Sequence, residues 1–121
     1  NISKMINSCR ENTYDTSSMK DYKKNNLYIS WPDLVVEEAD CKKDQEFWKR
    51  QYGKHGTCCA DSYNQEQYFD LAMSLKDKFD VLKSFSSYGI IRGKNYTVLS
   101  INSTVRAITQ GFPSLWCTER M

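Results

Sequence analysis

The sequence predicts an α+β fold in which helices dominate. Three stretches show helical periodicity or helix-end signals, namely residues 44–55, 65–83 and 101–110. Two short apolar runs, at residues 90–91 and 96–99, lie on either side of Gly93 and favour β segments. The chain has 121 residues, 40% of them hydrophobic and 13% aromatic, which suits one packed domain or part of one.

The first 26 residues are polar and rich in turn formers, so we expect mostly loop there, with room for a short helix. An apolar and aromatic run follows at residues 27–31 and stops at Pro32. Proline also biases the residue before it, Trp31, away from the α region. The run is either a strand or the end of a short helix, because its periodicity fits both.

The first main helix is predicted from Asp44 to His55. Asp44 suits its N-cap, Glu46 places negative charge in its first turn, and Gly56 follows as a stop signal. The only histidine of the chain therefore stands at the end of this helix.

A longer helix is predicted from Gln65 to Lys83. Asn64 and Gln67 match a capping box at its start, and Gly89 lies beyond its end. One stripe of its surface is apolar, and the residues of that stripe are Tyr68, Phe69, Ala72, Met73, Leu75, Phe79 and Leu82. The third helix, over residues 101–110, is predicted from the shared face of Ile101, Val105 and Ile108.

The charge balance is mildly basic. Seventeen Lys and Arg against fifteen Asp and Glu leave a formal net charge of +2. This bias tolerates a polyanionic partner without requiring one, because non-specific nucleic-acid binders usually carry a denser basic face. No run of about 18 apolar residues occurs, so no membrane-spanning helix is expected.

Cysteines and glycosylation sequons favour an oxidising, extracellular setting. The five cysteines are many for a cytosolic chain of this length: Cys9, Cys41, Cys58, Cys59 and Cys117. No pair has the CxxC spacing of zinc sites or redox motifs. Asn-x-Ser/Thr sequons begin at Asn1, Asn95 and Asn102. Because the cysteine count is odd, at least one thiol is free or has its partner outside this chain.

The candidate chemistry lies at the end of the first main helix. Gln51 and His55 are four residues apart and share a helix face, and Lys54 is adjacent. A histidine beside cations can act as general acid or base, while Lys and Gln contact an anionic group. Such a cluster suits phosphoryl chemistry, in which fixed donors stabilise charge on equatorial oxygens. The alternative from the residues alone is a partly buried polar histidine on a solvated basic helix face.

Residues 47–58 resemble the second active-site motif of the ribonuclease T2 family. The matching positions are Phe47, Trp48, Tyr52, Lys54, His55, Gly56, Thr57 and Cys58. Further segments resemble the S-ribonuclease branch, the pistil enzymes of self-incompatible flowering plants. They are the doubled Cys58-Cys59, residues 27–34, and residues 67–73 with 89–93. The resemblance runs from about Leu27 to Cys117.

The resemblance implies a ribonuclease T2-like fold that is helix-rich and has a small antiparallel sheet. Residues 1–121 would form a single, incomplete domain, with a variable loop region (1–26) and a catalytic-helix and core region (27–121). The family's first active-site motif, His-Gly-Leu-Trp-Pro, does not occur in the sequence. We therefore expect an internal piece that is inactive on RNA by itself, because it carries only one of two catalytic histidines.

By similarity, His55 would take the proton of the ribose 2′-hydroxyl, and Lys54 would stabilise the phosphorane oxygens. A histidine outside this chain would protonate the 5′-leaving oxygen, giving a 2′,3′-cyclic phosphate without a metal or cofactor. Gln51 stands where the family motif usually has Glu, and its amide can still donate a hydrogen bond to a phosphoryl oxygen. We expect this substitution to affect the rate more than the type of reaction.

The resemblance also implies a pairing of Cys9 with Cys58. Cys41 and Cys59 form a second bridge or remain free thiols, and Cys117 resembles a family cysteine whose partner lies further along the full chain. The expected glycosylation sites are Asn95 and Asn102.

The resulting prediction is a secreted, monomeric endoribonuclease that acts in pistil self-incompatibility. Its substrate would be RNA, its partners would be pollen F-box-type recognition proteins, and it would not associate with membranes. The alternative on the same scaffold is a recognition protein with impaired catalysis, of which Gln51 is the first sign. Without the resemblance, the residues also fit a secreted binding module stapled by cystines.

Overall fold

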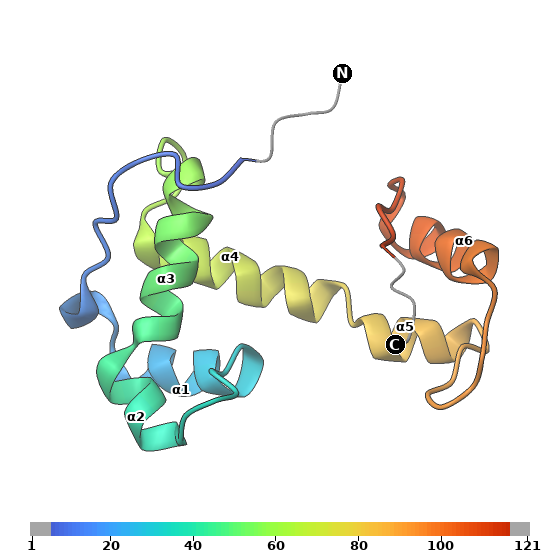
Figure 1. The fold of residues 1–121 in the computed structure, drawn as a ribbon, viewed down its shortest axis with the longest axis horizontal. Helices are drawn as coiled ribbons and strands as arrows, with labels where there is room; N and C mark the ends of the chain where they lie inside the picture. Colours follow the sequence, from blue (N-terminus) through green and yellow to red (C-terminus); the bar gives the residue numbers. More distant parts are fainter. Residues whose placement is uncertain (1–5, 117–121) are drawn as a thin grey trace. The chain divides into compact units, whose positions relative to one another are not determined.

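The computed structural model describes residues 6–116, and every regular element in that range is a helix (Figure 1). In chain order the elements are the 3-10 helix η1 (Thr16–Ser18), α1 (Asp21–Ser30), α2 (Glu38–Asp44), α3 (Glu46–Lys54), the 3-10 helix η2 (Gly56–Cys59), α4 (Gln65–Lys78), α5 (Val81–Ser87) and α6 (Val98–Thr109). The chain divides into two compact units, Asn1–Leu75 and Lys76–Met121. Within the described range, no helix is long and apolar enough to cross a membrane.

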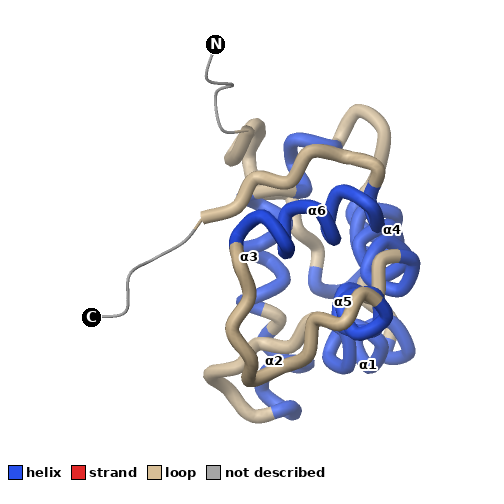
Figure 2. The backbone as a smooth tube through the Cα atoms, turned by 90° about the vertical axis from the view of Figure 1, so that its right-hand side faces the viewer, coloured by secondary structure: helices blue, strands red, loops and turns tan. Residues whose placement is uncertain are grey.

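The predicted small sheet is wrong for residues 6–116, which contain helices and loops only (Figure 2). Ile90 and Ile91 lie in a loop that the Tyr96 side chain closes. The Tyr96 hydroxyl accepts a hydrogen bond from the Ile91 N–H at 2.7 Å and donates one to the Gly89 carbonyl at 3.0 Å. These side-chain hydrogen bonds satisfy backbone groups that a strand would have paired in a ladder.

The second predicted β segment ends inside α6 instead. Thr97 caps this helix, since its hydroxyl accepts a hydrogen bond from the Ser100 N–H at 3.1 Å. The cap starts the helix at Val98, so Val98 and Leu99 are helical. The helix predicted over residues 101–110 is confirmed, with an earlier start and an end at Thr109.

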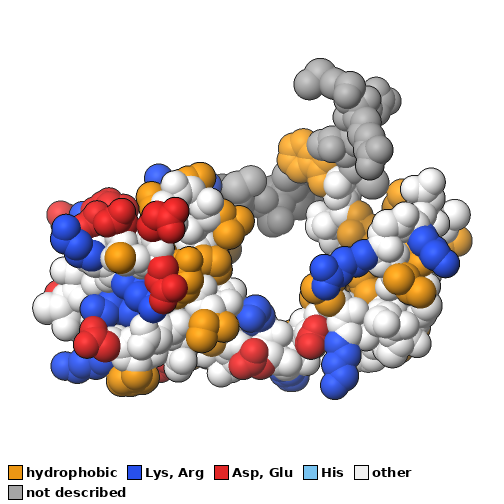
Figure 3. Space-filling view, turned by 90° about the horizontal axis from the view of Figure 1, so that it is seen from below, with side chains coloured by type: hydrophobic (Ala, Val, Ile, Leu, Met, Phe, Trp, Pro, Cys, Tyr) orange, Lys and Arg blue, Asp and Glu red, His pale blue; other side chains and the backbone are white. Residues whose placement is uncertain are grey.

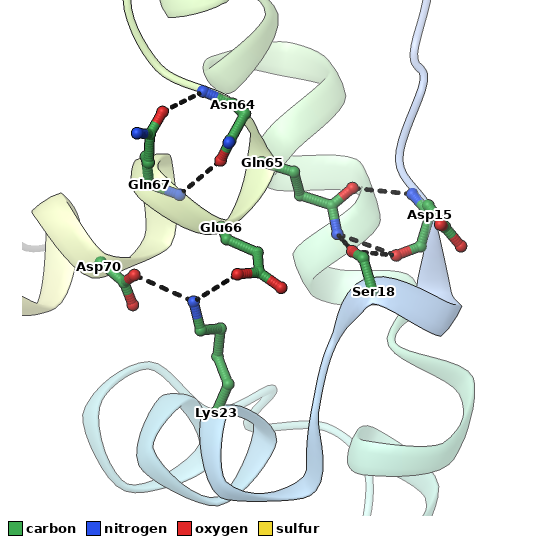
Figure 4. Close-up of polar contacts among 8 residues, drawn as sticks. All are labelled: Asp15, Ser18, Lys23, Asn64, Gln65, Glu66, Gln67 and Asp70. Carbon is green, nitrogen blue, oxygen red and sulfur yellow. Dashed lines mark hydrogen bonds and ion pairs between the residues drawn. The ribbon is translucent and has the colours of Figure 1, made fainter.

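The long helix predicted from Gln65 to Lys83 is two helices. Its capping box is confirmed: the Asn64 N–H donates to Gln67 Oε1 at 3.0 Å, and the Gln67 N–H donates to Asn64 Oδ1 at 2.9 Å (Figure 4). α4 ends at Lys78, however, and Asp80 starts α5 by accepting a hydrogen bond from the Lys83 N–H at 3.0 Å. A new N-cap inside an apolar stripe interrupts a helix without interrupting its periodicity.

The first 26 residues, predicted as mostly loop with room for a short helix, contain η1 and the start of α1, which begins at Asp21. The apolar run at residues 27–31 is the end of this helix, one of the two alternatives, and the Trp31 N–H donates to the Leu27 carbonyl at 2.5 Å. Pro32 then follows directly, as expected for a proline that cannot continue a helix.

The predicted N-cap at Asp44 is wrong, because Asp44 is the last residue of α2. Gln45 separates α2 from α3 and adopts a left-handed conformation with φ of 54°. Such a conformation is uncommon outside Gly, Asn and Asp. Its contacts explain why it persists here. Gln45 is 4% exposed, its Oε1 accepts a hydrogen bond from the Tyr14 hydroxyl at 2.8 Å, and its Nε2 donates to the Thr16 carbonyl at 3.3 Å.

The core of the first unit is aromatic and centres on α3 and α4. Its buried hydrophobic residues are Met19, Leu27, Cys41, Trp48, Tyr52 and Phe69. The Phe69 ring lies 6.2 Å from the rings of Tyr14, Trp31 and Tyr52, so a single α4 side chain joins three segments. Aromatic pairs at such separations add to the stability that their buried area provides. The core therefore fixes the face of α3 that carries Trp48 and Tyr52.

A buried ammonium group joins α1 to α4 (Figure 4). Lys23 is 2% exposed, and its Nζ lies 3.0 Å from an Asp70 oxygen and 3.6 Å from a Glu66 oxygen. A charge removed from water in this way is tolerated only when paired. Gln65 at the start of α4 makes a second tie, since its side chain bonds the backbone of Asp15 at 2.8 and 2.9 Å.

Burial raises the pKa of the Tyr14 hydroxyl, with a further contribution from the negative charges of Asp15 and of Cys41 in its ionised form. The folded protein therefore favours the neutral phenol that donates to Gln45. Folded Tyr14 keeps its proton at a pH where the unfolded chain has lost it. Stability from this group is present below the ordinary pKa of 10.0 and is lost as pH rises above it.

Tyr14→Phe should lower the free energy of unfolding at neutral pH by about 1–3 kcal/mol, because the buried Gln45 Oε1 loses its donor. The variant also lacks the group that keeps its proton in the folded state. Its stability should therefore fall less steeply at alkaline pH, and the two proteins should converge. Urea unfolding monitored by circular dichroism across the neutral-to-alkaline range measures both effects.

Tyr22→Phe is the matched control, because Tyr22 is 62% exposed, and it should change stability by less than about 0.5 kcal/mol at neutral pH. Tyr68, whose pKa is raised by burial and by the charge of Cys59, leaves a residual alkaline slope in every variant. A difference between Tyr14→Phe and the parent that stayed constant with pH would contradict the interpretation.

Candidate active site

The last turn of α3 presents the three predicted site residues together. Lys54 ends the helix and His55 follows as its C-cap, with the His55 N–H donating to the Gln51 carbonyl at 2.9 Å. Lys54 and His55 are exposed and Gln51 is half-buried. Within residues 6–116 none of these three side chains forms a hydrogen bond or ion pair with the protein. Their polar groups therefore remain available to a ligand.

Two buried residues of the same helix, Trp48 and Tyr52, fix the orientation of this turn. Trp48 and Tyr52 are 0% and 5% exposed, and the Trp48 indole N–H donates to the Trp31 carbonyl at 2.8 Å. At about 100° per residue, Gln51 and His55 fall on the border of this buried face. The core that holds Trp48 and Tyr52 thus determines where the site residues point.

Gly56, two residues after the end of α3, has no room for a side chain. A Cβ at this position would collide with the ring of Tyr52, which lies directly against the glycine. Thr57 follows, is 2% exposed, and donates its hydroxyl to the Gly53 carbonyl at 2.9 Å. The turn that follows α3 therefore needs a glycine at position 56, because the Tyr52 ring occupies the space of a side chain.

The disulfide predicted between Cys9 and Cys58 is present, and it ties the N-terminal segment to η2 across 49 residues of sequence. Of the two alternatives for Cys41 and Cys59, a second bridge or free thiols, the structure has the free thiols. Cys41 is a buried free thiol in the core and Cys59 is an exposed free thiol. Cys41 lies within α2, where it packs as a small hydrophobic side chain. Cys117 lies outside the described residues.

The electrostatics of the turn come from an unpaired lysine. Lys49, on the same helix, lies 3.6 Å from Glu46, whereas Lys54 has no acidic partner within the described range. On the first unit, at the left of Figure 3, cationic and acidic side chains are interspersed. Lys54 therefore offers a positive charge at the end of α3 that an anion can reach.

A shallow depression lies between the end of α1 and the first half of α3. It is formed by residues 30–35 together with Phe47 and Arg50. The Trp31 and Phe47 rings meet edge to face with centroids 6.0 Å apart. Among residues 6–116, no group of three or more His, Cys, Asp or Glu side chains could hold a metal ion.

The predicted sugar sites differ in exposure. Asn95 is exposed in the loop before α6, whereas Asn102 is half-buried within α6. The third sequon begins at Asn1, outside the described residues. Accessibility therefore favours Asn95 as an acceptor over Asn102.

Sequence analysis missed the contacts that the N-terminal segment makes with α3. The Ser8 N–H donates to the Lys54 carbonyl at 2.7 Å, and the Asn12 Nδ2 donates to the Lys49 carbonyl at 3.0 Å. Both contacts join residues that are far apart in the sequence. No periodicity or short motif signals contacts of this kind, so the sequence offered no way to find them.

An exposed histidine and an unpaired lysine, held at a disulfide-anchored helix end in a helical unit, define a candidate site for acid–base chemistry on an anion. The family model for the Ribonuclease T2 family matches residues 1–121, and the chain belongs to that family. The chain is 54% identical to Ribonuclease S-6 of Nicotiana alata over 120 residues, which is 98% of this chain and 55% of that protein.

Other relatives agree with this assignment. Ribonuclease S-7 of Nicotiana alata is 53% identical over 121 residues, 98% of this chain and 56% of that protein. The crystal structure of the Nicotiana alata self-incompatibility-associated SF11-RNase matches with a TM-score of 0.89 and 35% identity, covering 100% of this chain and 61% of that one. The resemblance to S-ribonucleases is thus confirmed. The chain spans about half the length of the curated relatives it matches.

Replacing both Cys9 and Cys58 with Ser should lower the free energy of unfolding by about 4 kcal/mol, because the bond closes a loop of 49 residues in the unfolded chain. Cys59→Ser, at an exposed free thiol beside the bond, is the matched control and should change stability by less than about 0.5 kcal/mol. Urea unfolding of oxidised protein measures both. Equal midpoints for the double variant and the control would contradict the proposed weight of this bond.

Proposed function

We propose that this chain provides the base side of an RNA-cleaving active site in a secreted S-ribonuclease of the ribonuclease T2 family. The proposal rests on Lys54 and His55, which are exposed at the end of α3 and have no ion-pair partner among residues 6–116, in a chain of that family. The family assignment raises an ordinary exposed histidine to a candidate catalytic group. The surrounding helix end, disulfide and glycine turn supply the rigidity that such a group needs.

In the proposed reaction, His55 accepts the proton of the ribose 2′-hydroxyl as that oxygen attacks the adjacent phosphorus. The Lys54 ammonium stabilises the negative charge that develops on the phosphoryl oxygens, and the Gln51 amide donates a hydrogen bond to one of them. The P–O5′ bond breaks and the leaving oxygen takes a proton from a second acid. Because the chain has one histidine, that acid belongs to another part of the full-length protein. The products are a 2′,3′-cyclic phosphate and a free 5′-hydroxyl.

The charge distribution supports RNA contacts that are few and local. The net charge is +2, because seventeen Lys and Arg are nearly balanced by fifteen Asp and Glu. Affinity would then come from phosphates bound beside Lys54 and Arg50 and not from a broad basic surface. Binding should accordingly show a modest dependence on salt.

The relatives are S-ribonucleases, and on that basis we propose a role in pistil self-incompatibility, with secretion, a monomeric state and recognition by pollen F-box-type proteins. Asn95 is the proposed glycosylation site of the described loop. Gln51 favours a second candidate, a recognition protein with impaired catalysis on the same scaffold. The two candidates differ in whether the full-length protein cleaves RNA through His55.

In the full-length protein, His55→Ala should abolish cleavage, because no other described side chain can take the 2′-hydroxyl proton at that position. Lys54→Ala should lower kcat by about 10²–10³-fold, as loss of one transition-state donor does. Gln51→Glu should change the rate and its pH dependence and leave the cyclic-phosphate product unchanged. Cleavage of a fluorogenic oligoribonucleotide, with product analysis by mass spectrometry, measures all three effects.

Lys43→Ala is the matched control for Lys54→Ala, because Lys43 is also an exposed lysine. The substitution removes the same charge, but from the neighbouring helix α2. It should leave kcat within about twofold of the parent. Wild-type cleavage by His55→Ala, or no cleavage by the parent itself, would favour the recognition protein over the enzyme.

A further inference from the structure

Residues 8–12, the N-terminal strap, contact α3 at two points and η2 at one. The Ser8 N–H donates to the Lys54 carbonyl, Cys9 is bonded to Cys58, and the Asn12 amide donates to the Lys49 carbonyl. The last carbonyls of a helix have no partner within it and usually bond to water. Here the carbonyl of a proposed site residue, Lys54, is held by the strap at 2.7 Å.

Asn12 is placed more closely than an ordinary surface asparagine. Its Nδ2 donates to the Lys49 carbonyl at 3.0 Å, and its Oδ1 accepts a hydrogen bond from the Tyr14 N–H at 3.2 Å. Its amide also lies directly against Gly53, where a Cβ would collide with Nδ2 and Cγ of Asn12. The absence of a side chain at position 53 is what permits this approach.

The strap and the site lie on different faces of the same helix. At about 100° per residue, Lys49 and Gly53 share one face, and Gln51 and His55 lie roughly opposite. The aromatic core holds the helix along Trp48 and Tyr52. The helix end that carries Lys54 and His55 is thus held from two sides, by the core and by the strap.

We infer that Asn12 is a positioning residue that sets the placement of Lys54 and His55 through its contacts with Lys49 and Gly53. The inference rests on the proposed ribonuclease function. Catalysis by a general base and a fixed cation depends on placement within about an ångström, and an error of that size costs about 10²-fold in rate. A helix end freed on one side can move by that amount while the core and the disulfide keep the protein folded.

The alternative is that Asn12 is a solvated residue whose hydrogen bond competes with water and contributes only to stability. The two alternatives predict different effects of an Asn12 substitution on kcat and KM. Asn12 lies behind the helix and contacts no proposed substrate group, so loss of positioning lowers kcat and leaves KM nearly unchanged. A stability effect alone lowers the melting temperature and leaves both constants unchanged for the folded fraction.

The first test uses Asn12→Ala in the full-length protein, with Asn7→Ala as the matched control, because Asn7 is an exposed asparagine nearby in the same segment. Asn12→Ala should lower kcat by about tenfold, less than the full effect of misplacement because Ser8 and the disulfide remain. Asn12→Asp keeps the size of the side chain and its acceptor for Tyr14 but cannot donate to Lys49, so it should resemble Asn12→Ala. Asn7→Ala should keep the parent kcat.

The second test uses Gly53→Ala, for which a structural role and a positioning role of Asn12 predict different results. Alanine raises the helix propensity of α3, so a merely structural role predicts a more stable protein with unchanged activity. A positioning role predicts a lower kcat, because the new Cβ displaces the Asn12 amide. Adding Asn12→Ala removes most of the collision, so the double variant should be no slower than Asn12→Ala alone.

The outcomes separate this inference from the proposed function. A parent protein that does not cleave RNA overturns the proposed function and, with it, the role of Asn12. A parent that cleaves RNA, together with Asn12→Ala at the parent kcat, overturns the positioning role and leaves the function standing. Additive losses of kcat in the double variant would also overturn it, since they would mean that residues 12 and 53 act independently.

Discussion

The structure of the first unit depends on one constraint: α3 must bury one face completely while keeping its last turn open to solvent. Trp48 and Tyr52 meet the first requirement within an aromatic core that Phe69 joins together. Gly56 meets the second, because it lets the chain turn beneath Tyr52 without a Cβ. The disulfide between Cys9 and Cys58 then anchors the turn where the core ends. Every feature of the candidate site follows from this division of a single short helix.

The clustering of the candidate site residues at one helix end was predictable from the sequence, and much of the fold was not. Gln51, Lys54 and His55 are close in the chain, so a helix suffices to bring them together, and the motif around them is specific. Periodicity also located the main helices, but it could not show the N-cap at Asp80 that divides one of them. The left-handed turn at Gln45 depends on a hydrogen bond from Tyr14, distant in the sequence, and no local propensity predicts it.

Two lysines show how surroundings decide what a residue does. Lys23 is buried, and its ammonium group is paired with Glu66 and Asp70. Its charge therefore joins α1 to α4 and cannot reach a ligand. Lys54 has no acidic partner in the described part of the chain and stands in solvent beside His55. Both residues are lysines, so only their surroundings distinguish them. The first belongs to a segment predicted as variable loop, and its burial means that the segment includes positions that packing constrains.

The same segment also contacts the candidate site, and this changes what its predicted variability would mean. A solvated loop could change freely without affecting catalysis, which is how residues 1–26 look from composition alone. In the structure, the strap residues Ser8 and Asn12 donate hydrogen bonds to α3, and Cys9 is bonded to Cys58 in η2, just after His55. Substitutions there would alter the helix end as well as the surface. If recognition differences among S-ribonucleases arise in this segment, they must spare its contacts with α3 or be accompanied by changes in that helix.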